Sequence, residues 1–546
     1  MTFLDWAIVL LLNGAIVVYG LLRSRETHTA ADWFLAGRSL PWWIVGLSLW
    51  ATAIDSSDLV ADAGYVFQGG VTYFVTNWVG GVVGWVVAAH LVVLPMYRAG
   101  MYTNAEYLEA RFGPAARVIS ALVQVQYRTL VLGIMAKTMY LVFAVVCGWE
   151  PAAAWSAVVV LALLASLYTA LGGLKSVAVT DALQTVIMVA AGFTLFWLAW
   201  DQVEGWNGLQ ERLDASRAGL AAELLRVGTP SPDVPSVLWG CLAFFVMGFA
   251  YSIVNHTQSM RLFASRSEWD LKMAVVPAAV LIITMTFVNL MVGIMGRAIY
   301  PETSAMPVDL ELQSRDSIYP VLIRDLATTG LRGLIVGGVV ASILSTFDSI
   351  GSTLSSLLVR DVYARLIKRD GDDAHYLRLG RWLTPVIIFG SFLYVPFMGE
   401  EGMLNFYLSL VSAFVVPLLT VYLLGTLTGV NRKTGTLGLV VGVAYGLLRL
   451  SLEGGGADNP LGTMHQSYVL TMVATCLPMV VLSSFLGWEK RGELRYEEQA
   501  GWLRESQRLA SESAAPSVGT RSSVVPIILG LLVIALGAVL SFVVFW

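Results

Sequence analysis

Long apolar runs separated by short polar segments dominate the chain. A helix needs about 20 apolar residues to cross a bilayer core about 30 Å thick. Fourteen segments meet this requirement, so the pattern predicts an all-α polytopic membrane protein with about 14 transmembrane helices. The segments are 4–22, 41–69, 73–97, 117–147, 151–171, 178–200, 236–262, 273–298, 331–363, 378–398, 402–428, 434–450, 465–487 and 524–545.

Composition agrees with this pattern and excludes other classes. Of the 546 residues, 57% are apolar and 13% are charged, and mean hydropathy is +0.71. Soluble domains carry roughly 25% charged residues, so a soluble enzyme or a disordered scaffold is excluded. A net charge of −4 offers no basic surface for nucleic acid. Cys147, Cys241 and Cys476 form no CxxC pair, so no disulfide framework is expected.

Basic residues follow the alternation of the loops, and membrane proteins carry such residues on the cytoplasmic side. We therefore expect a multi-pass protein of the plasma membrane with both termini outside the cell. The two long loops near 201–235 and 299–330 would lie on the outer side. The basic loops contain Arg23, Arg25, Arg38, Arg98, Arg111, Arg117, Lys175, Arg261, Arg266, Lys272, Arg360, Arg365, Lys368, Arg369, Arg378, Arg381, Arg432, Lys433 and the region from Lys490 to Arg521.

The spans fall into three predicted regions. Residues 1–30 form an extra N-terminal helix, which lacks a small-residue cleavage site and is expected to be retained. Residues 31–430 form the core, and residues 431–546 carry the last three helices. Within that last region, 488–523 is expected to be a cytoplasmic connector, either amphipathic or flexible.

The second segment contains three acids, Asp55, Asp58 and Asp62, which share one helical face. Acids inside a membrane are costly and are candidates for function. They would line water, bind cations or cap an interruption in the helix.

The ninth segment carries a continuous stripe of hydroxyl side chains, with Asp348 beside it. Small hydroxyl residues allow close packing of membrane helices, which is one explanation. Packing does not explain Asp348, and hydroxyls together with the carbonyls of an unwound helix suit Na⁺. The stripe consists of Ser342, Ser345, Thr346, Ser349, Ser352, Thr353 and Ser356.

A second polar interruption, at 248–258, predicts another broken helix. The two interrupted segments each begin a group of five spans, as in an inverted five-plus-five repeat with its site at the breaks. Within this interruption, His256 is either a structural histidine or a proton relay. In the fourth segment, Arg128 would either clamp a substrate carboxylate, or snorkel or pair with an aspartate.

Several ordered motifs give the chain a family resemblance. The clearest is the Gly-Gly…Thr-Asp-x-Leu-Gln pattern within 170–188. Supporting stretches are 32–38, 106–113 and 300–302, and Leu331–Leu334 and Asp361–Tyr363 bracket the hydroxyl stripe. With these motifs the chain resembles the sodium/solute symporter family, nearest its sodium–glucose cotransporter branch.

The resemblance implies the leucine-transporter fold, in which helices 2–6 and 7–11 are inverted repeats. It also implies Na⁺ as the coupling ion, with no other cofactor. Its main sodium site corresponds to Ala53, Ser56, Ser342, Ser345 and Thr346. A second cation or proton site found in some relatives corresponds to Asp181, Ser345, Asp348 and Ser349.

The predicted substrate site contains Tyr251, Asn255 and Ser409, which the resemblance matches to sugar-site positions of the family. It also contains four polar residues found inside the predicted spans, namely Asp55, Asp58, Arg128 and His256. In sugar transporters, a His or Gln stands at the position of Val60, a Lys at that of Ile282 and a Gln at that of Ser409. A site short of hydrogen-bonding partners binds a hexose poorly. The sequence therefore leaves open a sugar, an organic acid or an amine.

The leading hypothesis is Na⁺-driven import of a small polar solute by alternating access. The alternative is a solute sensor of the same fold that signals through a separate protein. An uncoupled transporter is disfavoured by the hydroxyls at Ser345 and Thr346. The expected partners are the solute, Na⁺ and the lipid bilayer, with neither nucleic acid nor an obligate protein partner.

Overall fold

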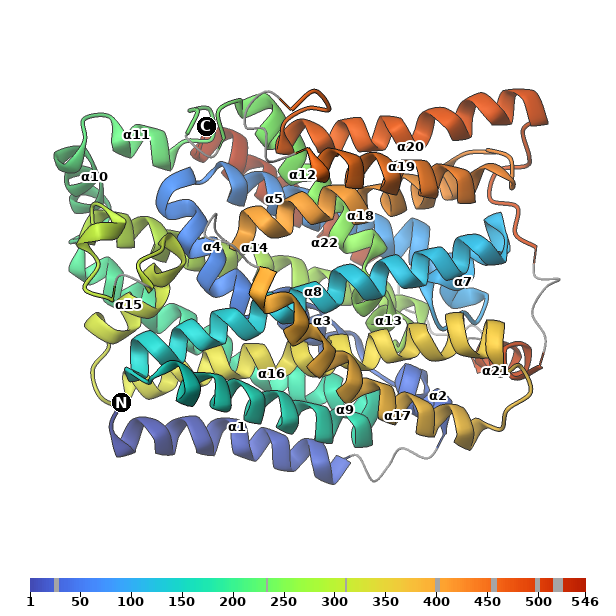
Figure 1. Ribbon diagram of the computed structural model, residues 1–546, viewed down its shortest axis with the longest axis horizontal. Helices are drawn as coiled ribbons and strands as arrows, with labels where there is room; N and C mark the ends of the chain where they lie inside the picture. Colours follow the sequence, from blue (N-terminus) through green and yellow to red (C-terminus); the bar gives the residue numbers. More distant parts are fainter. Residues whose placement is uncertain are drawn as a thin grey trace.

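The computed structural model is helical, and its one isolated strand-like bridge joins Leu40 to Ser265. It describes residues 1–23, 29–231, 234–309, 312–397, 403–452, 459–495, 501–513 and 524–546. The long helices run side by side as a bundle, and both termini lie at the same end as α10 and α11 (Figure 1). The opposite end, which carries α7, α21 and the arginine-rich connections, is called the basic face below.

The elements follow one another in two groups. The first half contains α1 (Phe3–Arg23), α2 (Ala30–Leu35), α3 (Trp42–Ala53), α4 (Ser56–Gly69), α5 (Thr72–Val87), α6 (Val93–Arg98), α7 (Asn104–Phe112), α8 (Pro114–Cys147), α9 (Pro151–Gln202), α10 (Gly205–Ser216) and α11 (Leu220–Leu225). The second half contains α12 (Val237–Val254), α13 (His256–Phe263), α14 (Glu268–Ile299), α15 (Ile318–Leu326), α16 (Leu331–Leu357), η7 (Leu358–Ile367), α17 (Asp373–Gly390), η8 (Ser391–Phe397), α18 (Met403–Leu427), α19 (Thr434–Ser451), α20 (Met464–Leu486), α21 (Gly501–Ser513) and α22 (Val524–Val539).

Among the described residues, twelve helices are long and apolar enough to cross a membrane, and the bent pair α3–α4 adds a thirteenth. One of the twelve, α9, contains two of the predicted spans, because the chain reverses at Gly173, where φ is +61°. Tyr168 and Asp181 would lie about 20 Å apart in a straight helix. Instead, they bond to neighbouring residues of α16. The predicted count of about 14 is reached when α9 is counted as two spans.

Two helices are interrupted in the middle of the bundle. Between α3 and α4 the chain bends by 52°, with Ile54 in an extended conformation and Asp55 capping α4. Between α12 and α13, Asn255 is extended and its side chain caps α13. Helix ends leave backbone groups unpaired, and each break places one carbonyl end and one amide end inside the protein.

The two halves of the core pack in equivalent ways. The first broken helix packs through α3 against α14, and the second packs through α12 against α5. In an inverted repeat, the first broken helix corresponds to the second, and α5 corresponds to α14. The contact of α3 with α14 is therefore equivalent to the contact of α12 with α5. The packing agrees with the predicted inverted repeat.

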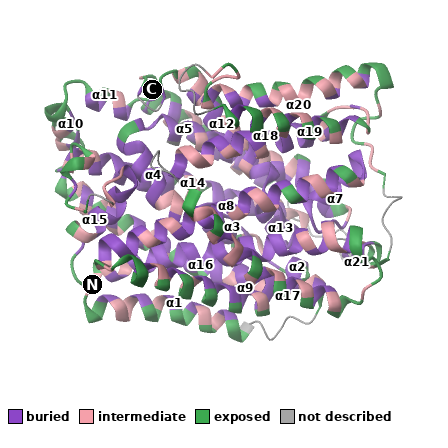
Figure 2. Cartoon of the chain, in the orientation of Figure 1, coloured by how far each residue is buried: buried purple, intermediate pink, exposed green. Residues whose placement is uncertain are grey.

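Large apolar side chains are exposed around the sides of the bundle. They include Leu10 and Leu11 of α1, Leu477 of α20 and Leu531 of α22. In contrast, α16 is buried along most of its length (Figure 2). An apolar exterior around a polar interior is what a bilayer requires, so this is a multi-pass membrane protein.

Glycines set the distance between α5 and α12. A methyl group added at Gly248 would lie 2.2 Å from the backbone oxygen of Asn77, and one at Gly80 would lie 2.1 Å from that of Phe245. Small residues allow this close approach of membrane helices. The contact fixes α12 just before its break.

We expect Gly248→Ala to destabilise the protein, because the added methyl group has no space and overpacking costs about 1–3 kcal/mol. The measurement is the unfolding midpoint of detergent-purified protein. Gly81→Ala is the matched control, since its nearest neighbour would be Ser252 Oγ at 3.9 Å. Equal midpoints for the two variants would contradict the proposed close contact.

Candidate functional site

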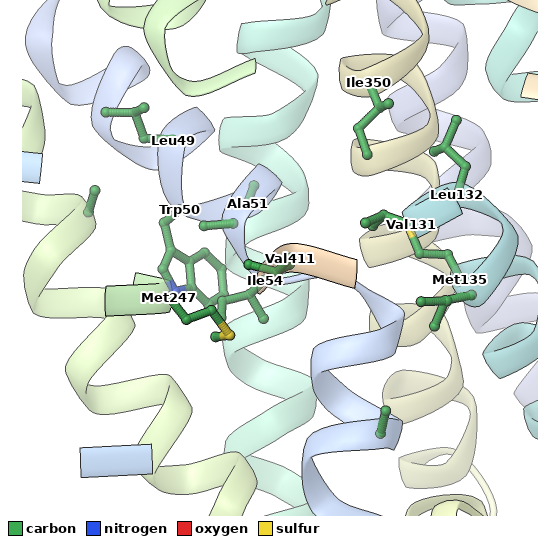
Figure 3. Close-up of a cluster of buried hydrophobic side chains, with 14 of the residues drawn as sticks. Leu49, Trp50, Ala51, Ile54, Val131, Leu132, Met135, Met247, Ile350 and Val411 are labelled. Carbon is green, nitrogen blue, oxygen red and sulfur yellow. The ribbon is translucent and has the colours of Figure 1, made fainter. Parts of the chain in front are cut away.

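The centre of the bundle combines an apolar layer with a small polar cavity. Figure 3 shows part of the apolar layer, which draws Trp50 from α3, Val131 from α8, Met247 from α12, Ile350 from α16 and Val411 from α18. The cavity lies between α3–α4, α8, α12 and α18 and has a volume of about 40 Å³. Its lining consists of Ala53, Asp55, Ser57, Asp58, Ala61, Asp62, Arg128, Val131, Ile134, Tyr251, Met403, Leu404 and Tyr407.

The acids of the cavity also hold the first helix break in place. The Asp55 carboxylate accepts a hydrogen bond from the backbone N–H of Ser57 at 2.7 Å, and the Asp58 carboxylate accepts one from the N–H of Asp55 at 2.7 Å. This reciprocal arrangement is a capping box. Capping and a place in the cavity are therefore not alternatives for Asp55 and Asp58, because both acids do both.

Arg128 enters the cavity from α8 and is almost fully buried. Its guanidinium carbon lies 5.7 Å from the centre of the Tyr251 ring and 6.0 Å from that of Tyr127. Its Nε and Nη2 atoms are buried without a hydrogen-bonding partner, and it takes part in none of the ion pairs found in the described ranges. The structure thus shows neither the snorkelling nor the aspartate pair considered for Arg128.

Three of the other predicted substrate residues lie outside the cavity lining. Asn255 caps α13 through Oδ1, which accepts from the N–H of Thr257 at 3.0 Å. The backbone N–H of His256 donates to Gln124, and its ring is buried. Ser409 lies on α18, where its carbonyl accepts from Ser412. Of the seven predicted residues, Asp55, Asp58, Arg128 and Tyr251 line the cavity.

Of the predicted sodium residues on α16, Ser345 contacts the first broken helix. Ser345 Oγ donates to the carbonyl of Ala51 near the end of α3, at 3.0 Å. Thr346 is fully buried, and its Oγ1 has no hydrogen-bonding partner. The hydroxyl of Ser342 bonds within α16, and that of Ser56 bonds to Thr138 at 3.0 Å. Of the five predicted residues, Ala53 and Ser56 flank the break itself.

A guanidinium occupies the centre of the predicted second cation site. Arg261 Nη2 lies 3.0 Å from Asp181 Oδ2 and also bonds to Ser349, while Arg261 Nε donates to Ser48 at 2.7 Å. Ser48 in turn donates to Asp181 at 2.6 Å. These side chains are fully buried, and they join α3, α9, α13 and α16.

Asp348 lies next to this group without touching the arginine. Its two oxygens accept hydrogen bonds from Tyr168 and, at 3.0 Å, from Ser349. Two carboxylates, Asp181 and Asp348, therefore share a fully buried cluster that contains one fixed positive charge.

The placement of Arg261 corrects the sequence prediction, which counted it among the basic loop residues. Its side chain is 0% exposed, because α13 turns inward after the second break and carries it to Asp181. The sequence contained one signal for this pair, because Arg261 and Asp181 are opposite charges that follow an interruption or kink in their helices. Asp62 was recognised as part of the acid stripe but not as a site residue, although it lines the cavity.

Buried ion pairs close the basic face. Arg117 pairs with Asp361 at 2.5 Å and Glu109 at 2.6 Å, and Arg360 pairs with Glu106 at 3.0 Å. The three acids belong to the 106–113 and 361–363 motifs, whose structural role the sequence did not reveal. The network ties α7 and α8 to η7, which continues α16.

Helix α21, which belongs to the predicted connector 488–523, packs against this network. Trp502 stacks on Tyr376 with ring centres 4.0 Å apart, and its ring lies 4.8 Å from the Arg360 guanidinium. Arg360 also donates to Ser506 at 3.1 Å. Residues 496–500 and 514–523 of the connector lie outside the described residues.

Two solved structures share this arrangement of helices. One is a Na⁺-coupled sialic acid symporter in a substrate-bound outward-open state, with a TM-score of 0.75 and 18% identity, covering 90% of this chain and 99% of that one. Another is Mhp1, a nucleobase-cation-symport-1 family transporter in a closed conformation, with a TM-score of 0.53 and 12% identity, covering 88% and 97%. The likeness establishes the leucine-transporter-like fold.

The sequence comparisons then give the family. The profile of the sodium:solute symporter family matches residues 33–442, and the chain belongs to this family. Similar proteins include sodium/glucose cotransporter 4 of Danio rerio (27% identity, 82% of this chain and 72% of the relative) and sodium/glucose cotransporter 1 of Sus scrofa (28%, 82% and 72%). Sodium/myo-inositol cotransporter 2 of Rattus norvegicus is 27% identical over 80% of this chain and 68% of the relative. The protein is a Na⁺-coupled solute symporter rather than an enzyme, as the sequence predicted.

The Arg261–Asp181 pair gives a testable consequence. Removing one partner of a buried ion pair leaves an uncompensated charge and costs about 3–5 kcal/mol. We expect Asp181→Asn and Arg261→Gln each to lower the unfolding midpoint strongly, and the double variant to lose less than the two single losses combined.

The control for this cycle is Arg98→Gln. Arg98 pairs with Glu268 at 2.7 Å on the surface, with 57% of its side chain exposed. Such exposed pairs contribute about 0–1 kcal/mol. Strictly additive losses at Asp181 and Arg261 would show that the two side chains are not coupled.

Proposed function

We propose that one Na⁺ binds between the first helix break and α16, held by the carbonyls of Ala53 and Ser56 with the oxygens of Ser342, Ser345 and Thr346. The observation that carries this proposal is the fully buried Thr346 hydroxyl, which has no hydrogen-bonding partner in the described part of the chain. Its neighbour in the chain, Ser345, reaches the Ala51 carbonyl near the end of α3. A hard cation takes several oxygen ligands, and helix ends supply free carbonyls. Family membership and the position of the break support the same site.

Coupling follows from where the ion binds. Na⁺ would join α3–α4 to α16, and the three acids of the cavity come from α4 and its N-cap residue, Asp55. An ion that fixes this joint also fixes the cavity wall, so ion and solute bind with reciprocal effects on each other's affinity. The imported solute is small, polar and organic, either sugar-like or an organic acid or amine.

The second site is expected to work differently from the first. Arg261 already supplies a positive charge at Asp181, so a second Na⁺ would compete with a fixed guanidinium. The set Asp181, Ser345, Asp348 and Ser349 contains two acids. Among the described residues, an arginine contacts Asp181 but none contacts Asp348. We assign it the exchange of a second cation or a proton during transport.

The protein is placed in the plasma membrane with its basic face toward the cytoplasm. The distribution of Lys and Arg supports this orientation. Both termini lie at the end opposite the basic face and would be outside the cell (Figure 1).

We expect NaCl, but not KCl or choline chloride at equal ionic strength, to stabilise detergent-purified protein. At a hundredfold excess over the dissociation constant, a bound ion adds about 2.7 kcal/mol. Thr346→Ala should abolish the Na⁺-specific shift in unfolding temperature. The control is Ser352→Ala, because the Ser352 hydroxyl bonds only within its own helix, to the carbonyl of Ser349 at 3.2 Å. A shift of the same size in Thr346→Ala and unmodified protein would rule out this site.

A separate experiment addresses Asp348. In proteoliposomes, Asp348→Asn should change the number of cations that move with each solute molecule, because the amide carries no exchangeable charge. The measurement is the reversal potential of solute flux at set Na⁺ and proton gradients. An unchanged reversal potential would show that Asp348 does not take part in coupling. Binding of solute without any flux in unmodified protein would instead favour the sensor alternative.

A further inference from the structure

The central cavity contains charges of both signs that the protein itself does not pair. Asp58 and Asp62 lie one helical turn apart on α4, and Arg128 reaches the cavity from α8. Each of these side chains lines the same cavity, and none of them takes part in an ion pair in the described part of the chain. An unpaired charge inside the protein is costly, and a ligand that supplied the missing partners would remove this cost.

Arg128 has hydrogen-bond donors that no acceptor among the described residues uses. The aromatic rings of Tyr127 and Tyr251 flank it, and its Nε and Nη2 atoms have no protein partner. Nε together with one Nη atom is the edge of a guanidinium that binds a carboxylate through two parallel hydrogen bonds. A buried, unpartnered donor pair of this kind favours a carboxylate over a hydroxyl.

The acids are not equivalent. Asp55 accepts hydrogen bonds from both the backbone N–H and the hydroxyl of Ser57, at the break where Na⁺ is proposed to bind. Asp58 uses Oδ2 to accept from the Asp55 backbone and has its other oxygen available. Asp62 lies one turn further along α4 and also faces the cavity. Asp58 and Asp62 are thus the acids placed to receive a positive group of a ligand.

We propose that the transported solute is a small zwitterion, whose carboxylate is bound by Arg128 and whose ammonium group is bound between Asp58 and Asp62. This inference rests on the proposed Na⁺-coupled transport and names the substrate class of the same site. Val131, Ile134 and Leu404 provide an apolar wall for the carbon chain that joins the two charged groups.

Other solute classes fit the charges less well. A simple carboxylate would leave Asp58 and Asp62 unpaired, and a simple amine would leave Arg128 unpaired, each at the cost of a buried charge. A neutral sugar would leave both unpaired. The cavity of about 40 Å³ has room for a few water molecules, so it must widen for any solute, and a small one requires the least widening.

The test uses a fixed set of probes on full-length protein in NaCl and in KCl. The zwitterions L-alanine, L-proline, β-alanine and γ-aminobutyrate vary the spacing between ammonium and carboxylate. Propionate and n-propylamine each lack one of the two charges, and D-glucose and myo-inositol are neutral. The measurement is the unfolding temperature as a function of probe concentration, followed by uptake of the tightest binder into proteoliposomes.

At least one zwitterion should stabilise the protein saturably in NaCl but not in KCl, with the singly charged and neutral probes at least about tenfold weaker. Asp62→Asn and Arg128→Lys should each weaken that zwitterion at least about tenfold. Thr129→Val is the control on α8, because the Thr129 hydroxyl bonds to its own helix at the Val125 carbonyl.

The proposal is overturned if no zwitterion binds, or if propionate, n-propylamine, D-glucose or myo-inositol binds as tightly as the best zwitterion. The probe series on unmodified protein decides this even if a cavity variant does not fold. The Na⁺-specific stabilisation without any probe is measured alongside. If Na⁺ stabilises the protein but no zwitterion binds, only the proposed substrate class is wrong. If Na⁺ does not stabilise the protein, the proposed sodium site is wrong.

Discussion

The structure depends on two helix breaks that must be satisfied inside a membrane. Every backbone group that leaves its helical hydrogen bond in lipid needs another partner. Asp55 supplies one such partner at the first break and Asn255 supplies one at the second. The carbonyl ends are satisfied differently, since Ser345 of α16 reaches the carbonyl of Ala51. The same unsatisfied groups that make a break costly are those that can bind an ion, so the weak points of the fold and its site coincide.

Buried charges connect helices of the bundle in two separate layers. Near the centre, Arg261 links α13 to Asp181 of α9 and to α16. At the basic face, Arg117 links α8 to Glu109 and to Asp361 of η7. Separating such partners inside the protein is costly, because it leaves an uncompensated buried charge. Helix α21 covers part of the second layer, because Trp502 and Ser506 both contact Arg360.

Periodicity and motif spacing predicted the fold well because membrane spans have a length set by the bilayer. The chain reversal inside α9 and the break at Asp55 were visible as Gly-Gly and acidic interruptions of apolar runs. The sequence did not predict that Arg261 is buried, since a basic residue after an apolar run resembles a loop residue until its partner is known. Nor did it separate Asn255 and His256, which serve the second break, from Tyr251, which reaches the cavity. Distances between helices far apart in sequence decide these cases, and no local pattern contains them.

The relation to sugar cotransporters concerns the scaffold more than the cavity. Relatives named for glucose and myo-inositol are 27–28% identical, and the identity is spread over most of this chain. The family profile covers residues 33–442, a range that includes both helix breaks and α16. The side chains of the cavity wall must instead match the proposed solute. Here the wall combines Asp58, Asp62 and Arg128. A hydroxyl-rich solute neutralises none of these charges, and leaving a charge unpaired inside the protein is costly. The charges of the cavity therefore constrain the solute more tightly than the similarity of the whole chain does.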